Sequence, residues 1–396
     1  MVLSPRHPES DVFFIPICVN INCNEGIIII EMKKVFLITL VWFLVINAFS
    51  LIALNRLNLE KDSAYQWIID SDAKVEQQTW NPTVSHAQWD SFWLISVVDK
   101  GYQYTEGKLS NIVFFPAYPA LIKLLSLIFG EYILSGWVVS AVFLFLAMLM
   151  FYKLVHEFHP KINPYYPIIF LLLFPTAFFL NAVYTESTFL FFSIATFFYL
   201  LKRKFWLAGL FGMFAALTRI NGILLIIPFI WELYQHLRVS KKTKFTFLSS
   251  LLVPLGTAIF FFYHYIRFGD FLLFFKIQKM WGRGFSPDLA IFRFDNPQMI
   301  VNFALDVSFI IFGIIASIFV IRRIRTSYGL YTLAAIAVPL ISGTIMGIGR
   351  FILVLFPLFI LPATFKNEMS RYVWISISSG MLALYTLLFV NNYWAG

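Results

Sequence analysis

Two acidic residues and three arginines stand out because each interrupts or borders a long apolar run. The acids are Asp90 and Glu186, and the arginines are Arg219, Arg283 and Arg350. A carboxylate can take the proton of an attacking hydroxyl, and guanidinium groups can stabilise a phosphate leaving group. If the fold gathers these side chains on one surface, the sequence predicts a site that deprotonates a sugar hydroxyl and releases a phosphate.

Most of these charged positions also have a plainer interpretation. Asp90 falls in the first turn of an expected helix, where the helix dipole favours a carboxylate. Glu186 lies at the membrane boundary, where an ionisable group is costly and a functional candidate, but it can also cap a helix. Arg219 can be a snorkelling arginine at a helix end. For the basic-aromatic segment 267–283 the alternative is generic anchoring at the lipid interface.

The segment around Asp90 predicts an amphipathic helix. Trp89, Phe92, Trp93 and Ser96 recur at positions i, i+3, i+4 and i+7, which places them on one helical face. We expect this helix to lie in the membrane interface with its aromatic face on the bilayer. Solvated loop groups are expected at His86, Asp99 and Glu106.

The composition requires lipid as solvent. The 396 residues are 60% hydrophobic and 13% charged, whereas a soluble domain is about half apolar and about a quarter charged. The net charge of +9 comes from short Lys and Arg clusters between apolar runs, which is typical of cytoplasmic loops and does not indicate nucleic-acid binding. Cys18 and Cys23 suit neither a disulfide framework nor a zinc site. No metal-ligand or nucleotide-binding motif occurs, so no metal or cofactor is expected.

The first 31 residues differ from the rest. They are polar and contain proline, whereas Met32-Lys33-Lys34 followed by the uncharged run Val35–Leu54 is typical of the start of a membrane protein. That run has about the 20 residues that a span requires. We hypothesise that translation begins at Met32 and that residues 32–396 form one transmembrane domain with an outer loop at 57–112. Peptides from residues 1–31 in mass spectra would contradict this.

The remaining apolar runs predict a polytopic all-α bundle, because backbone groups in lipid must be satisfied within helices. They lie at 113–129, 133–152, 165–181, 187–201, 205–218, 222–235, 246–266, 299–321, 327–346, 351–364 and 372–391.

The basic connections between these runs fix an orientation, because cytoplasmic loops are enriched in Lys and Arg. All of them fall on one side only if 113–129 is a juxtamembrane or re-entrant helix. Pro116 and Pro119 at its start favour that exception. The sequence thus predicts about eleven spans, with the N-terminus inside and the segments 57–112, 182–186, 267–298 and 347–350 outside. The basic connections are Lys33-Lys34, Lys153/Lys161, Lys202-Arg203-Lys204, Arg238/Lys241/Lys242/Lys244, Arg322-Arg323-Arg325 and Lys366/Arg371.

The motifs on the outer face carry a family resemblance. The chain resembles the phosphatidylinositol-glycan class V mannosyltransferases, the second GPI mannosyltransferase and its prokaryotic relatives, within the GT-C superfamily. The matching elements follow the family order over roughly residues 85–360: Trp89-Asp90 with Gly101-Tyr102, Phe114-Phe115-Pro116 with Tyr118-Pro119, Phe174-Pro175 with Tyr184-Thr185-Glu186-Ser187, Thr218-Arg219 with Asn221-Gly222, Gly269-Asp270 with Gln278 and Trp281-Gly282-Arg283, and Arg350 with Phe356-Pro357.

The resemblance implies a GT-C fold and an inverting transfer of a sugar, usually mannose, from a polyprenyl-phosphate donor to a glycan or glycolipid acceptor. The active face would be extracytoplasmic or lumenal, in the plasma membrane of a prokaryote or the endoplasmic reticulum of a eukaryote. Asp90 matches the acid taken as the catalytic base or acceptor-orienting group, Glu186 matches the second outer acid, and both are expected to be catalytic. The substrate-binding positions, for which lipid-phosphate contact is inferred from charge, are Arg219, Arg283, Arg350, Trp89, Tyr184, Asn221, Gln278 and Trp281.

Three alternatives stay open at this point. A lipid-linked sugar flippase or transporter would place charged groups at the bilayer midplane and often shows internal repeats. No convincing repeat occurs here, and the acids cluster near one surface. A GT-C enzyme that uses another sugar would keep the same motifs. A non-enzymatic partner subunit would have lost one or both carboxylates, and this chain has both.

Overall fold

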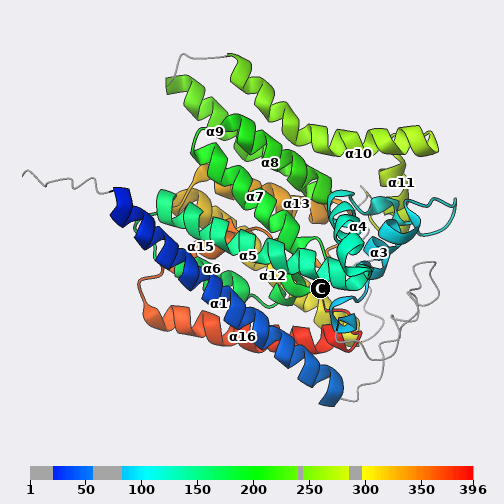
Figure 1. Cartoon of the computed structure of the whole chain (residues 1–396), viewed down its shortest axis with the longest axis horizontal. Helices are drawn as coiled ribbons and strands as arrows, with labels where there is room; N and C mark the ends of the chain where they lie inside the picture. Colours follow the sequence, from blue (N-terminus) through cyan, green and yellow to red (C-terminus); the bar gives the residue numbers. More distant parts are fainter. Residues whose placement is uncertain (1–20, 57–82, 240–243, 285–296, 396) are drawn as a thin grey trace, which may run out of the picture.

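The computed structural model describes residues 21–56, 83–239, 244–284 and 297–395 (Figure 1). The described part contains helices and no strand, which confirms the all-α class. The helices are α1 Ile21–Arg56, η1 Val84–His86, α3 Asp90–Lys100, η2 Asn111–Val113, α4 Ala117–Phe129, α5 Tyr132–Phe158, α6 Tyr165–Leu172, η3 Ala177–Asn181, α7 Glu186–Leu201, α8 Phe205–Thr218, η4 Ile220–Leu225, α9 Ile226–Val239, η5 Lys244–Leu251, α10 Leu252–Phe268, α11 Leu273–Met280, α12 Pro297–Arg323, α13 Thr326–Ile341, α14 Ile348–Leu353, α15 Pro357–Ile360, η7 Pro362–Thr364 and α16 Glu368–Val390.

The proposed start at Met32 falls inside α1, which is continuous from Ile21. Glu31 forms an ion pair with Lys34 at 2.7 Å and accepts a hydrogen bond from the Tyr165 hydroxyl. The translation start therefore stays a prediction. Residues 1–20, with Cys18, lie outside the described residues, as do 57–82 of the predicted outer loop.

The bundle is a layer of long helices with short helices at one end. α5, α7, α8 and α10 pack in that order, α12 packs on α13, and α1 lies against α5 and α16 (Figure 1). α8 and α10 approach closely because small residues face each other. A Cβ at Gly209 would lie 2.3 Å from the Ser249 carbonyl oxygen, and one at Gly256 would lie 2.3 Å from that of Met213.

Six helices of the described part are long and apolar enough to cross a membrane. They lie at Ile30–Arg56, Tyr132–Phe158, Ile220–Arg238, Phe245–Phe268, Ile300–Arg323 and Glu368–Val390, and four shorter apolar helices accompany them. The protein is therefore an integral membrane protein, while the count of about eleven spans and the orientation stay predictions.

Two of the predicted spans contain a break between their helices. The run 165–181 is α6 and η3, separated by a break at Phe174-Pro175. The run 351–364 is divided among α14, α15 and η7, with Pro357 and Pro362 at the beginnings of the last two. Proline ends a helix because it lacks the N–H donor and its ring clashes with the preceding turn. Both breaks lie next to residues of the site described below.

α4 is one of the four shorter apolar helices, and the expectation that 113–129 is not a full crossing stays a prediction. Its 13 residues span about 20 Å, whereas the hydrocarbon core is about 30 Å thick. It ends at Gly130, which has a φ of 70°, and folds back on the beginning of α5. The Tyr118 hydroxyl holds this hairpin through contacts of 2.9 Å to the Gly136 carbonyl oxygen and 2.8 Å to Ser140.

A buried carboxylate on α9 joins two connections at the end of the bundle that carries Lys202–Lys204 and Arg322–Arg325, hereafter the basic end. Glu232 on α9 is 2% exposed. Arg325 donates to both of its oxygens at 2.6 and 2.8 Å, Arg203 donates at 3.1 Å, and Ser327 donates at 2.7 Å. Since the basic clusters 202–204 and 322–325 meet here, the structure agrees with their assignment to one side of the membrane.

We expect Glu232→Gln to destabilise the protein by about 1–3 kcal/mol. A broken buried ion pair costs about 3–5 kcal/mol, and the loss is smaller here because the two arginines are about one third exposed and can hydrate. Thermal unfolding in detergent measures this. Glu157→Gln is the matched control, since Glu157 is 43% exposed and pairs with Lys202. Equal midpoints for both variants would contradict the role of Glu232.

Candidate active site

Asp90 begins α3 on a strained turn. Trp89, which precedes it, has a φ of 54°, a conformation that costs a side-chain-bearing residue about 1–3 kcal/mol. Tyr184 holds the turn, because its hydroxyl donates to the Gln88 carbonyl oxygen at 2.9 Å and accepts from the Asp90 N–H at 3.2 Å. The Trp89 indole N–H donates to the Tyr393 carbonyl oxygen at 3.2 Å. These contacts fix where the Asp90 carboxylate leaves the backbone.

Glu186 begins α7, just after the irregular chain that follows η3. Its side chain is 0% exposed. The free-energy cost of burying a carboxylate in this way would be prohibitive without a group of opposite charge close to it. The breaks that end α6 and α8 allow partners from distant segments to reach it.

Four charged side chains contact one another in a row of alternating charge: Asp90, Arg350, Glu186 and Arg219. Arg350 donates from Nη1 to Asp90 Oδ2 at 2.7 Å and from Nε to Glu186 Oε1 at 2.9 Å. Arg219 Nη1 lies 2.7 Å from the same Glu186 oxygen. These groups lie on four segments that are far apart in the sequence, and the fold brings them into direct contact.

Burial divides the two acids by role. The Asp90 side chain is 26% exposed, whereas Arg350 and Arg219 are 11% and 13% exposed and Glu186 is fully enclosed. Of these two acids, Asp90 is the one that solvent reaches. Both oxygens of Glu186 are enclosed, and one of them is shared by two guanidinium groups, so this carboxylate is suited to holding the arginines.

Aromatic rings surround the arginines. The Arg350 guanidinium carbon lies 4.6 Å from the Tyr184 ring centre and 4.8 Å from that of Phe179. Arg219 and Arg283 each lie 5.4 Å from the Phe351 ring centre. Faces of aromatic rings attract cations, so the rings fix the guanidinium groups while leaving their N–H donors available to a ligand.

Arg283 adds a cation without a carboxylate partner among the described residues. It follows α11, and its backbone N–H donates to the Gln278 carbonyl oxygen at 2.8 Å. The next residue, Gly284, donates to the Ser342 carbonyl oxygen at 2.8 Å, which ties this loop to the end of α13. Burial lowers the pKa of Arg283 to about 10, so it stays cationic at neutral pH. With two acids and three arginines, the site carries a net positive charge that suits an anion.

Sequence comparison decides the family. The family model of mannosyltransferase (PIG-V) matches residues 27–322, about three quarters of the chain. The chain belongs to the PIG-V mannosyltransferase family. It is a membrane glycosyltransferase, as the order of motifs predicted.

Two further comparisons add little to this. A search of curated proteins finds no match. Among solved structures, the chain is similar to ArnT from Cupriavidus metallidurans bound to undecaprenyl phosphate, with a TM-score of 0.48 and 13% identity, over 89% of this chain and 76% of that one. A likeness this loose decides neither fold nor function.

The other predicted binding residues of this PIG-V family enzyme lie at different places. Trp281 packs edge-on against Trp93 of α3, with ring centres 5.2 Å apart. Gln278 contributes its carbonyl oxygen to the turn that carries Arg283, as described above. Asn221 is buried in η4, two residues past Arg219, and no hydrogen bond joins its side chain to the charged residues in the described part of the chain.

Two expectations for the outer loop are wrong. The aromatic face of α3 does not lie on the bilayer: Trp89, Phe92 and Trp93 are each about 5% exposed and pack inside the protein. His86 is not solvated but buried, and it stacks on Trp137 with ring centres 5.0 Å apart. Burial lowers the pKa of His86 to about 4, so the ring is neutral at pH 7. Apolar spacing shows that a helix has a face but not whether lipid or protein covers it.

Some residues of the site were not singled out from sequence. Phe179 and Phe351 contact the arginines, but each is one of 47 phenylalanines and nothing in its local pattern distinguishes it. Asp306 on α12 faces the backbone N–H of Ile348, at the beginning of the short helix that carries Arg350. A carboxylate inside an apolar run is a functional candidate by default, and this signal could have found Asp306. The described residues contain no group of three or more His, Cys, Asp or Glu side chains that could hold a metal ion.

Proposed function

We propose that this enzyme transfers mannose from a polyprenyl-phosphate donor to a hydroxyl of a lipid-linked or surface glycan, with inversion at the anomeric carbon. One observation carries the proposal: the chain of alternating charges ends in an accessible carboxylate, Asp90, next to arginines that a phosphate can bind. Membership of the mannosyltransferase family indicates that the sugar is mannose. The lipid environment of the bundle suits a lipid-borne donor.

The reaction would proceed in one displacement. Asp90 accepts the proton of the acceptor hydroxyl while that oxygen attacks the anomeric carbon from the face opposite the phosphate. The bond between the anomeric carbon and the phosphate oxygen breaks, and polyprenyl phosphate leaves with the electron pair. Arg350, Arg219 and Arg283 would stabilise the charge that develops on the phosphate, as fixed donors do in a site shielded from water.

Glu186 then has a positioning role in place of the catalytic role expected from sequence. It is enclosed, and it orients Arg350 and Arg219 toward one point through contacts of 2.9 and 2.7 Å. Proton transfer needs heavy atoms within about 3 Å of each other, and no substrate hydroxyl can approach a carboxylate that the protein covers entirely.

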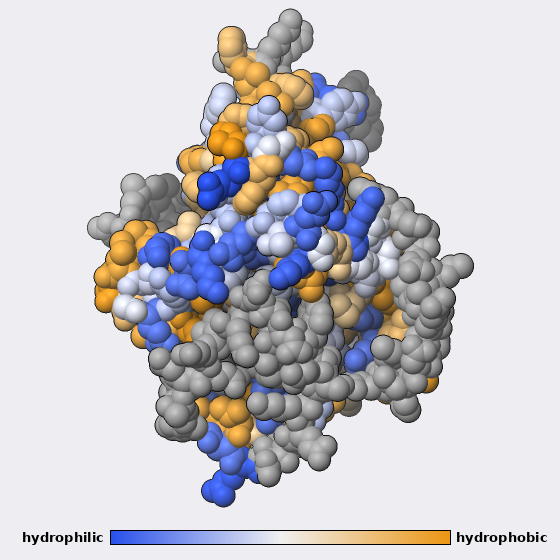
Figure 2. Space-filling model, turned by 90° about the vertical axis from the view of Figure 1, so that its right-hand side faces the viewer, coloured by the Kyte–Doolittle hydropathy of each residue, from blue (hydrophilic) through white to orange (hydrophobic). Residues whose placement is uncertain are grey.

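The segments that build the site lie at one end of the bundle. α3, α4 and α11 gather there, and Figure 2 shows hydrophilic residues over this end with hydrophobic residues beside them. We propose that this end is the extracytoplasmic or lumenal face, since the basic connections meet at the opposite end. The donor lipid would then enter from the leaflet on the side of the site.

The test of function is sugar transfer from radiolabelled polyprenyl-phosphate mannose in membranes that contain the full chain. We expect label in an acceptor fraction, and none in membranes without the protein. Polyprenyl-phosphate glucose and pentose donors run in parallel, and activity with one of these instead of mannose would keep the reaction class and replace the donor. Movement of the intact donor across sealed vesicles, with no transfer, would favour the flippase alternative and contradict the proposal.

A further inference from the structure

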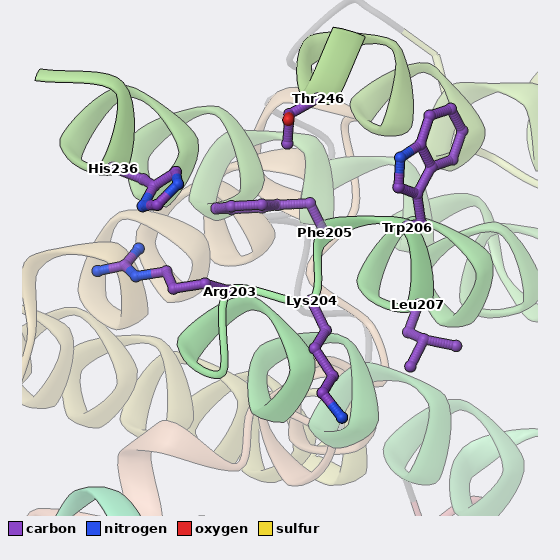
Figure 3. Close-up of a pocket in the computed structure, with 7 residues that line it drawn as sticks. All are labelled: Arg203, Lys204, Phe205, Trp206, Leu207, His236 and Thr246. Carbon is purple, nitrogen blue, oxygen red and sulfur yellow. The ribbon is translucent and has the colours of Figure 1, made fainter. Parts of the chain in front are cut away.

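A cavity at the basic end lies apart from the candidate active site. It has a volume of about 270 Å³ and is lined by Arg203, Lys204, Phe205, Trp206, Leu207, His236 and Thr246. The turn between α7 and α8, the end of α9 and the beginning of η5 form its walls (Figure 3). Glu186 lies at the other end of α7, and the 16 residues of that helix separate the two sites by about 24 Å.

The walls of the cavity are cationic and lack a free acid. Arg203 and Arg325 together share the single carboxylate of Glu232, which leaves one positive charge in that cluster. Lys204 adds another and is exposed, with no ion pair to a described residue. Between Arg203 and Phe268 the sequence contains no other acid than Glu232. This surface therefore attracts anions.

The backbone at the cavity also favours an anion. α8 begins here, and its cap residue Lys204 makes no side-chain capping hydrogen bond. The backbone N–H groups of Phe205, Trp206 and Leu207, which line the cavity, have no partner in the described part of the chain. The His236 ring lies 5.2 Å from that of Phe205 and faces the same side as Arg203, as Figure 3 shows. Imidazole adds a further N–H donor in either protonation state.

Apolar surface leads away from the cavity along two packed helices. On α8, Trp206, Leu207 and Leu210 are 55%, 39% and 40% exposed. On the neighbouring α10 and the residue before it, Leu251 and Leu255 are 51% and 43% exposed. In a membrane these side chains face acyl chains, and a tryptophan at the polar edge is typical of the headgroup level. The cavity therefore stands where a lipid headgroup would meet the protein.

We propose that this cavity binds the headgroup of an anionic phospholipid, with the phosphate near the first turn of α8 and the acyl chains on the exposed faces of α8 and α10. Charge selects an anionic lipid over a zwitterionic one by about five-fold for each Lys or Arg near the surface. The apolar faces select a lipid over free phosphate.

Native mass spectrometry of the full chain, released from nanodiscs of equal phosphatidylglycerol and phosphatidylcholine, tests this. We expect wild-type protein to retain one phosphatidylglycerol about five-fold more often than phosphatidylcholine. Lys204→Gln/His236→Gln should lose that preference. Lys202→Gln/His156→Gln, with the same chemical changes near the same end, should keep it. Similar thermal midpoints would show that all three proteins are folded.

Three results would overturn the proposal. Equal retention of the two lipids by wild-type protein would show that no anionic headgroup is selected. An equal loss in both double variants would mean that the basic end as a whole attracts anions. Displacement of phosphatidylglycerol by millimolar inorganic phosphate would identify a free-phosphate site in place of a lipid site.

Discussion

Asp90→Asn should lower sugar transfer by about 10²–10⁴-fold, the usual contribution of a positioned general base. The substitution keeps the size of the side chain and an oxygen that can accept from Arg350, but it removes the ability to take a proton. Because Asp90 is 26% exposed, the loss of its charge should change stability little. The expected signature is a lower kcat with a donor KM that is unchanged or lower, since Arg350 no longer shares its charge with Asp90.

Asp99→Asn is the matched control for this variant. It makes the same chemical change on the same helix, but Asp99 is exposed and lies outside the charge cluster. Its transfer rate should equal that of the wild type. A rate for Asp90→Asn within three-fold of the wild-type rate would remove Asp90 as the base, and an equal loss in both variants would indicate a general effect of charge on α3.

Arg350→Gln should lower both activity and stability. Arg350 contacts both carboxylates, and removal of one preorganised donor from a charged transition state costs about 10³-fold in rate. Glu186 stays enclosed with Arg219 as its remaining charged partner, so we expect a loss of about 3 kcal/mol in stability. Transfer assays and thermal unfolding in detergent measure the two effects separately.

A double variant separates these effects. Arg350→Gln/Glu186→Gln removes the under-compensated carboxylate together with the arginine, so stability should return most of the way while activity stays low. Arg267→Gln serves as control, because Arg267 is exposed and outside the cluster. Recovery of activity in the double variant would show that Arg350 only neutralises Glu186 and does not bind the donor.

Membrane insertion, two helix breaks and the family follow from the sequence by itself. Membrane insertion follows from composition, because long apolar segments require lipid however the helices pack against one another. The breaks near Pro175 and Pro357 follow from proline itself. The order of the motifs around Asp90 and Glu186 predicted the family, and the family model over residues 27–322 confirms that prediction. The number of spans rests on the apolar runs, their orientation rests on the loop charges, and both stay predictions.

The tertiary structure decided which charged residues meet and which of them solvent reaches. Sequence makes both Asp90 and Glu186 catalytic candidates, yet Asp90 is 26% exposed and Glu186 is enclosed. The tertiary structure also places the aromatic face of α3 against protein, where the sequence pattern suggested lipid. In a membrane protein both environments are apolar, so hydrophobic spacing cannot tell them apart. The contact between Asp90 and Arg350, 260 positions apart, depends on how the helices pack, and local sequence does not encode that distance.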